Sequence, residues 1–184
     1  MKKTIFAFLF LTLLAFSVGF SAEGLHFDAP LFITSGGQSP GALQMMVLAK
    51  AVKLEYVFEK ILPAAEFDPS SFKSAMIVVG ASGKGLGAAG IDVDQETERV
   101  LGIATLCQEN GIPLILVQLE GAARRGPSSD IILDALAPFA SALFVKADAN
   151  EDAKFTTLGE EYEIPLVLFE KTTDMRDLLK DYFF

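Results

Sequence analysis

The 184-residue chain has little cysteine, histidine or positive charge. Its one cysteine, Cys107, cannot form an internal disulfide, which leaves a buried thiol or a reactive one. Because Cys107 continues the apolar face of Val100 and Ile103, we expect it to be buried and unreactive. Its one histidine, His26, excludes a zinc site made of several histidines, and a catalytic serine triad would depend on this peripheral residue.

Acidic side chains outnumber basic ones. The chain holds 24 aspartates and glutamates against 15 lysines and arginines, a net charge of -9 at pH 7. An acidic surface repels the phosphates of nucleic acids and the head groups of anionic lipids. We therefore expect no nucleic-acid partner.

The first residues have the order of a cleavable signal peptide. Lys2 and Lys3 precede an apolar run at 5–20, and small residues follow near the end of that run. We expect export with cleavage after Ser21 or Ala22. The alternative is an uncleaved membrane anchor, which needs about 20 apolar residues.

Removal of this leader leaves one domain. Residues 1–22 are the expected signal peptide, and residues 23–184 suit a single α/β domain with a core that folds unaided. No linker, low-complexity stretch or run of like charges divides them. We expect the mature protein to be exported, either periplasmic or extracellular, and not inserted in a membrane.

Six short apolar runs alternate with helical patterns. Two of them, at 76–79 and 114–117, are continuously hydrophobic, which is typical of strands covered on both faces. The pattern predicts a three-layer, doubly wound α/β domain with a mostly parallel sheet of about six strands. We favour the flavodoxin-like strand order 2-1-3-4-5, with a sixth strand at the edge, over the Rossmann order because the chain is small. The expected strands are 31–34, 54–58, 75–80, 112–119, 142–145 and 164–169.

Helix starts are marked by capping residues, and one connection lacks a full helix. The segment 60–73 is interrupted by Pro63 and Pro69, so we expect an irregular crossover there. The helix that begins after Asp92 should end at Asn110 and Gly111. Further caps are expected at Ser39 before Pro40, at Ser128 or Ser129, at Asn150 and at Thr173.

Three loops at the carboxyl ends of the expected strands carry residues that suit a small anion. The first offers backbone amides and hydroxyls that lead into a capped helix, from Ser35, Gly36, Gln38 and Ser39. The second is a long, flexible, glycine-rich loop with one cation, and its candidate residues are Ser82, Lys84 and Gly85. The third places Arg124 and Arg125 side by side, and arginine binds carboxylates and phosphates bidentately.

Each loop also has a purely structural interpretation. Ser39 can serve simply as a helix cap, and the two arginines can neutralise nearby acids such as Glu120 and Asp130. Both interpretations stay open at this point.

More specific motifs are weak or broken. Gly85, Gly87 and Gly90 match the dinucleotide pattern, but no acid ends a second strand at the expected distance. The phosphate-loop and nucleophile-elbow patterns both fail in this segment. Asp92 and Asp94 stand at a helix start, where capping is favoured over metal binding, so we expect no metal site.

Three segments resemble a known family. LFITSGGQS, IVVGASGKGLGAAGIDVD and EGAARRGPSSD are similar to segments of a bacterial family of exported proteins, domain of unknown function number 6305. The resemblance extends from Pro30 to about Leu179. It implies an exported α/β domain and no established activity or catalytic residue.

The sequence thus favours an exported protein that binds a small anionic ligand at the carboxyl edge of its sheet. The first alternative is an interaction module that docks on a protein of the cell envelope through apolar residues such as Tyr182, Phe183 and Phe184. A hydrolase or transferase that uses Ser82 or a carboxylate is less favoured, because no histidine is placed to assist it. Whether the protein is an enzyme stays open, and its cofactor, if it has one, is unknown from the sequence.

Overall fold

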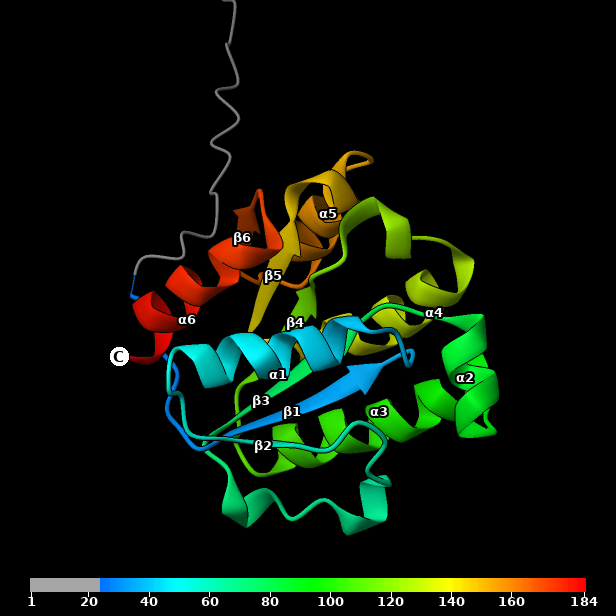
Figure 1. Ribbon diagram of the computed structural model, residues 1–184, viewed down its shortest axis with the longest axis horizontal. Helices are drawn as coiled ribbons and strands as arrows, with labels where there is room; N and C mark the ends of the chain where they lie inside the picture. Colours follow the sequence, from blue (N-terminus) through cyan, green and yellow to red (C-terminus); the bar gives the residue numbers. More distant parts are fainter. Residues whose placement is uncertain (1–23) are drawn as a thin grey trace, which may run out of the picture.

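The computed structural model describes residues 24–184, so the expected signal peptide at 1–22 lies outside the described residues. Six strands form one all-parallel sheet in the order β2-β1-β3-β4-β5-β6 (Figure 1). This is the flavodoxin-like order with a sixth strand at the edge, as the sequence predicted. The strands are β1 Leu31–Gly36, β2 Tyr56–Phe58, β3 Ser74–Val79, β4 Leu114–Gln118, β5 Ala142–Lys146 and β6 Leu166–Phe169.

Helices cover both faces of the sheet (Figure 1). Buried residues of α1 and α6 belong to one apolar core, whereas those of α3, α4 and α5 belong to the core on the opposite face. The helices are α1 Gly41–Ala51, α2 Gly83–Ala89, α3 Val93–Glu109, α4 Pro127–Leu136, α5 Lys154–Glu161 and α6 Met175–Phe183. None of the helices within residues 24–184 has the length and apolar character needed to span a membrane.

Alternation along the central strands fills both cores. Ile33 and Met76 are register partners on the α1 and α6 side, while Ile77 and Leu116 are partners on the α3 and α4 side. Successive side chains of a strand point to opposite faces, so a strand covered on both sides is hydrophobic throughout. This is why the continuous apolar runs in the sequence correspond to the central strands.

Cys107 lies in the core beneath α3, as expected from its apolar neighbours. It is fully buried, and burial raises the pKa of its thiol to about 12. Because the thiolate is the reactive form of cysteine, the buried thiol is chemically inert in the folded protein.

Several predicted caps are confirmed. Asp92 begins α3 in a capping box, since its carboxylate accepts from Gln95 N at 2.8 Å and the Gln95 side chain accepts from Asp92 N. Asn150 Oδ1 accepts from the amides of Phe155 and Thr156 at the start of α5. The crossover between β2 and β3 is irregular as expected, with only two short 3-10 turns, η1 Ala64–Glu66 and η2 Pro69–Ser71.

The predicted cap at Ser39 is wrong, because Pro40 is the cap residue of α1 and makes no side-chain cap hydrogen bond. Two further predicted caps are also wrong. α4 begins at Pro127 behind Gly126, whose φ is 134°, and Ser129 lies inside the first turn. Thr173 lies inside the 3-10 turn η6 Thr172–Asp174, which leads directly into α6. In both places the chain turns helically earlier than the capping residue suggested.

The glycine-rich segment after β3 is a helix, so the prediction of a long flexible loop is wrong. Ser82 Oγ accepts from Gly85 N at 3.1 Å and caps α2, which ends at Gly90 in the left-handed region with a φ of 71°. The abundance of glycine concealed this helix, because glycine disfavours helix interiors.

Candidate functional site

The loops after β1 and β3 are joined at the switch point of the sheet, where the strand order reverses. Ser39 N donates to Gly80 O at 3.2 Å, and Ser82 N donates to Gly37 O at 2.8 Å. Gly37 has a φ of 118°, and a Cβ there would lie 2.5 Å from Gly80 O. Only glycine fits so close to the backbone of the other loop, so the two loops are packed rigidly against each other here.

A buried ion pair of α3 fixes the loop after β1. Glu96 of α3 is fully buried, and its carboxylate accepts from Gly37 N at 2.8 Å and from Gln38 Nε2 at 2.9 Å. Arg99 Nε donates to Glu96 at 2.8 Å, and the same guanidinium donates to the carbonyls of Leu62 and Ser35. The loop is therefore fixed by charged hydrogen bonds, which are stronger than neutral ones.

Sequence reasoning missed this pair. Of the acids near the start of α3, only Asp92 and Asp94 were singled out from the sequence, as residues of a helix start. The available signal was position, because Glu96 lies four residues before Val100 and seven before Ile103, on the apolar stripe of α3. An acid on the buried stripe of a helix needs a partner, and Arg99 lies one turn away.

The loop after β4 contributes a second carboxylate at the switch point. Glu120 Oε2 accepts from Gly41 N, the first amide of α1, at 3.1 Å, and Arg124 Nε donates to Glu120 Oε1 at 3.2 Å. The Glu120 side chain is 13% exposed and that of Arg124 is 34% exposed. A Cβ on Gly80 would lie 2.9 Å from Ser39 Oγ and 3.4 Å from Arg124 Cβ. These residues therefore form one cluster, the switch-point cluster of Ser39, Gly41, Gly80, Glu120 and Arg124.

Arg125 belongs to a different group. Its guanidinium donates to Asp130 at 3.1 Å and to Asp152 at 2.9 Å, bonds the carbonyl of Ala149 and lies over the ring of Phe155. Hydrogen bonding to Arg125 lowers the pKa of Asp152 to about 2. Within the described residues these contacts include none from the loops after β1 and β3. Arg125 thus has the structural role that the sequence left open, connecting the start of α4 to that of α5.

The other predicted site residues build the loops. Ser35 Oγ accepts from Gln38 N at 2.9 Å, and the Gln38 side chain is buried against Glu96. Gly85 lies so close to Gln38 that a Cβ would be 2.1 Å from Gln38 O. Lys84 is exposed on α2. Gly36 ends β1, and a Cβ there would meet the Ile77 side chain at 2.8 Å.

The chain itself supplies acceptors for the amides that were expected to cradle an anion. Gly37 N donates to Glu96, Gly41 N donates to Glu120, and Ala81 N donates to Ser129 Oγ at 2.9 Å. Of the predicted residues, Ser39 and Arg124 remain in the switch-point cluster. Between residues 24 and 184 no group of three or more histidine, cysteine or acidic side chains is arranged to hold a metal ion.

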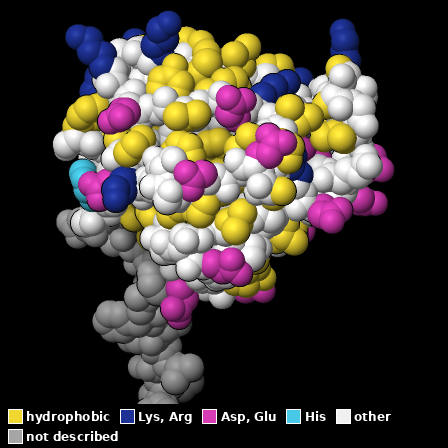
Figure 2. Space-filling model, turned by 90° about the horizontal axis from the view of Figure 1, so that it is seen from below, with side chains coloured by type: hydrophobic (Ala, Val, Ile, Leu, Met, Phe, Trp, Pro, Cys, Tyr) yellow, Lys and Arg dark blue, Asp and Glu magenta, His cyan; other side chains and the backbone are white. Residues whose placement is uncertain are grey.

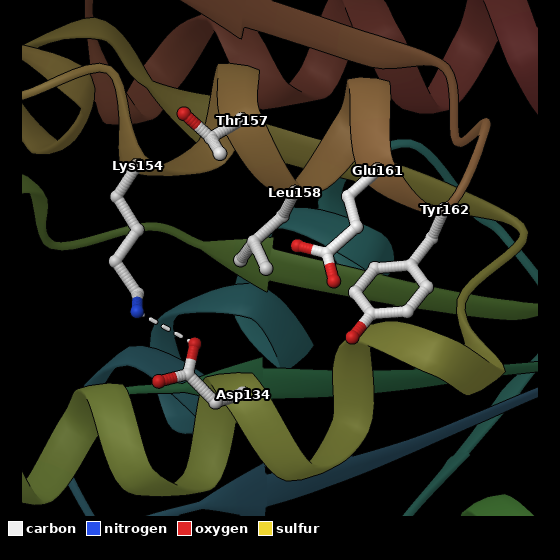
Figure 3. A pocket seen from close by; sticks show the side chains of 6 residues that line it. All are labelled: Asp134, Lys154, Thr157, Leu158, Glu161 and Tyr162. Atoms are coloured by element: carbon white, nitrogen blue, oxygen red, sulfur yellow. Dashed lines mark ion pairs between the residues drawn. The ribbon is translucent and has the colours of Figure 1, made fainter.

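A cavity of about 390 Å³ lies apart from these loops, between α4 and α5 (Figure 3). Lys154 Nζ pairs with Asp134 at 2.6 Å on one side of Leu158, while Glu161 and Tyr162 lie on its other side. None of the residues predicted from the sequence lines it.

The sequence matches a family model over almost the whole described domain. Residues 28–183 match the family described as Domain of unknown function (DUF6305). The chain belongs to this family. The resemblance expected from the sequence is confirmed, and the switch-point cluster lies within the DUF6305 domain. No curated protein matches the chain.

Two solved structures show weak similarity to this DUF6305 domain. One is a GDSL-like lipase from Bacteroides thetaiotaomicron, with 14% identity and a TM-score of 0.35, covering 75% of this chain and 66% of that chain. The other is the psychrotrophic esterase EstA from a Pseudoalteromonas species, with 12% identity and a TM-score of 0.35, covering 83% of this chain and 96% of that chain.

Proposed function

We propose that this DUF6305 protein binds a small anionic ligand, a carboxylate or a phosphate, at the switch-point cluster. The observation that supports the proposal is the position of Glu120. Its carboxylate lies at the amino end of α1 and is bonded by Gly41 N and by Arg124. Helix amino ends and arginine both stabilise negative charge. The chain thus already keeps one anion at the place where an α/β sheet of this kind binds ligands.

Arg124 is the group that meets the ligand. Within residues 24–184 its guanidinium is hydrogen-bonded only through Nε, to Glu120. The terminal nitrogens of a half-exposed arginine offer two parallel donors to an anion. An incoming carboxylate or phosphate displaces the Glu120 carboxylate from Arg124 and from the amino end of α1. Glu120 therefore acts as an internal competitor of the ligand.

The proposal predicts opposite effects for two substitutions, measured by calorimetric titration with acetate and with inorganic phosphate. Arg124→Gln lowers the affinity by about tenfold or more, because a charged hydrogen bond contributes about 1.5 to 3 kcal/mol. Glu120→Gln raises the affinity by up to about fivefold, the equivalent of the roughly 1 kcal/mol that an ion pair near the surface contributes.

Arg176→Gln is the matched control, since Arg176 is exposed on α6 and loses the same charge. It should leave the affinity unchanged. Thermal unfolding of all three variants shows whether the fold is intact. Equal binding by the Arg124 and Arg176 variants would sink the proposal.

The docking alternative loses part of its original basis. Phe183 is buried and the Tyr182 ring packs on Phe144 with centroids 5.1 Å apart, so only Phe184 of the three terminal aromatics is exposed. On the face seen in Figure 2, apolar side chains are interrupted by charged ones.

A further inference from the structure

An apolar groove runs along the water-facing side of α1. It has a volume of about 350 Å³ and lies between α1 and the turn η6. Leu43 and Val47 are four residues apart on α1, and their exposures are 52% and 54%. Gln44, Leu48 and Thr172 complete the lining. Two large apolar side chains one helical turn apart thus present a continuous strip to solvent.

Two connections through neighbouring residues join this groove to the switch-point cluster. Along α1, Gln44 of the groove lies three residues after Gly41, on the same side of the helix, and Gly41 N is the amide that donates to Glu120. Along the opposite side, Thr172 Oγ1 donates to the carbonyl of Leu119 at 3.3 Å, and Leu119 directly precedes Glu120. Both walls of the apolar groove therefore lead to the carboxylate that the proposed ligand displaces.

We propose that the ligand is amphiphilic, a straight-chain aliphatic carboxylate. Its head group binds Arg124 at the amino end of α1, and its chain lies over Leu43 and Val47. This inference rests on the proposed function and names the class of its ligand. From Gly41 to Val47 the helix rises about 9 Å, at 1.5 Å per residue. That length and the groove volume suit a medium chain, such as that of octanoate.

The charge at the cluster favours a carboxylate with one apolar tail over a bare anion. Arg124 offers a single guanidinium, which matches one carboxylate through two parallel hydrogen bonds. The groove adds apolar contact without any further cation, since uncharged side chains line it. Each methylene moved from water onto the groove should therefore raise the affinity, by about two- to fourfold for partial to full burial.

The test is a titration series with acetate, butyrate, hexanoate and octanoate, measured by calorimetry. The wild-type affinity should rise with each added methylene. Leu43→Gln and Val47→Gln should flatten this rise and leave acetate binding unchanged. Ile131→Gln is the matched control, because Ile131 is 50% exposed on α4, away from the groove, and its variant should keep the wild-type rise.

The outcomes separate the two proposals. Acetate binding that depends on Arg124 but shows no effect of chain length overturns the amphiphilic ligand and leaves the anion site standing. Failure of the protein to bind any of the four carboxylates overturns the amphiphilic ligand, and failure to bind inorganic phosphate as well overturns both proposals.

The remaining occupant of the groove is a second copy of the chain. Sedimentation of the wild type and of the Leu43→Gln variant tests it directly. A wild-type dimer that becomes monomeric in the variant would assign the groove to self-association and overturn the proposal. A monomer in both, together with the chain-length effect, supports the amphiphilic ligand.

Discussion

Glu96 is the one charged residue that is fully buried in the described part of the chain. Removal of a carboxylate from water costs several kcal/mol, and the attraction of Arg99 together with the donors of Gly37 and Gln38 offsets that cost. The role of the pair is to hold the loop after β1 in place. It is a positioning pair, since neither side chain belongs to the switch-point cluster.

Neutralising this carboxylate should destabilise the fold strongly. Glu96→Gln keeps the shape of the side chain but leaves the Arg99 guanidinium, only 10% exposed, without its counter-charge. Loss of one partner of a buried pair costs about 3 to 5 kcal/mol, and the free energy of unfolding in urea measures it. Glu98→Gln, at an exposed position two residues on, is the control and should change stability by less than about 0.5 kcal/mol. A Glu96 variant as stable as the Glu98 variant would contradict the argument.

At the scale of single elements, the stability of α2 comes from close packing on the loop after β1 and not from helix propensity. Its seven residues include three glycines, which disfavour a helix, yet Ser82 caps it and Gly85 packs directly on the backbone of Gln38. The helix thus exists because it packs on the loop after β1. Sequence reasoning failed here because tertiary packing overrides local propensity.

Two alanine substitutions within α2 should therefore change the stability of the protein in opposite directions. Gly85→Ala places a Cβ 2.1 Å from Gln38 O, so the helix and the loop must separate at a cost of about 1 to 3 kcal/mol. Gly87→Ala meets no atom within 4 Å and should stabilise the protein by about 0.5 to 1 kcal/mol, because alanine is the better helix former. Thermal unfolding of both variants measures the difference. Equal shifts of the midpoint would show that α2 is not packed as described.

At the scale of the whole molecule, sequence patterns predicted the layers, because buried parallel strands are hydrophobic throughout. The small size of the chain favoured the strand order that the structure has. They predicted the candidate site less well. Backbone amides near glycines looked available in the sequence, but Glu96 and Glu120 reach them from distant elements. In the sequence, Arg124 and Arg125 looked equivalent. In the structure, the chain turns at η3 Gly121–Arg124, and their side chains bind different partners. The bonds from distant amides to Glu96 and Glu120 depend on three-dimensional contacts that no local spacing encodes. The pairing of Arg124 with Glu120 and of Arg125 with Asp130 is the structural interpretation that the sequence had left open.

The cellular location is also a property of the whole molecule. We propose that the protein is exported. Lys2 and Lys3 before the apolar run at 5–20 give the basic end and hydrophobic core that export machinery recognises. The intact mass of the protein recovered from its native envelope fraction should correspond to cleavage after Ser21 or Ala22. Replacement of Lys2 and Lys3 by glutamate should slow processing and leave uncleaved precursor, because the basic end is lost. Full-length protein that retains Met1 and fractionates with the cytosol would overturn this proposal, without affecting the ligand site on the folded domain.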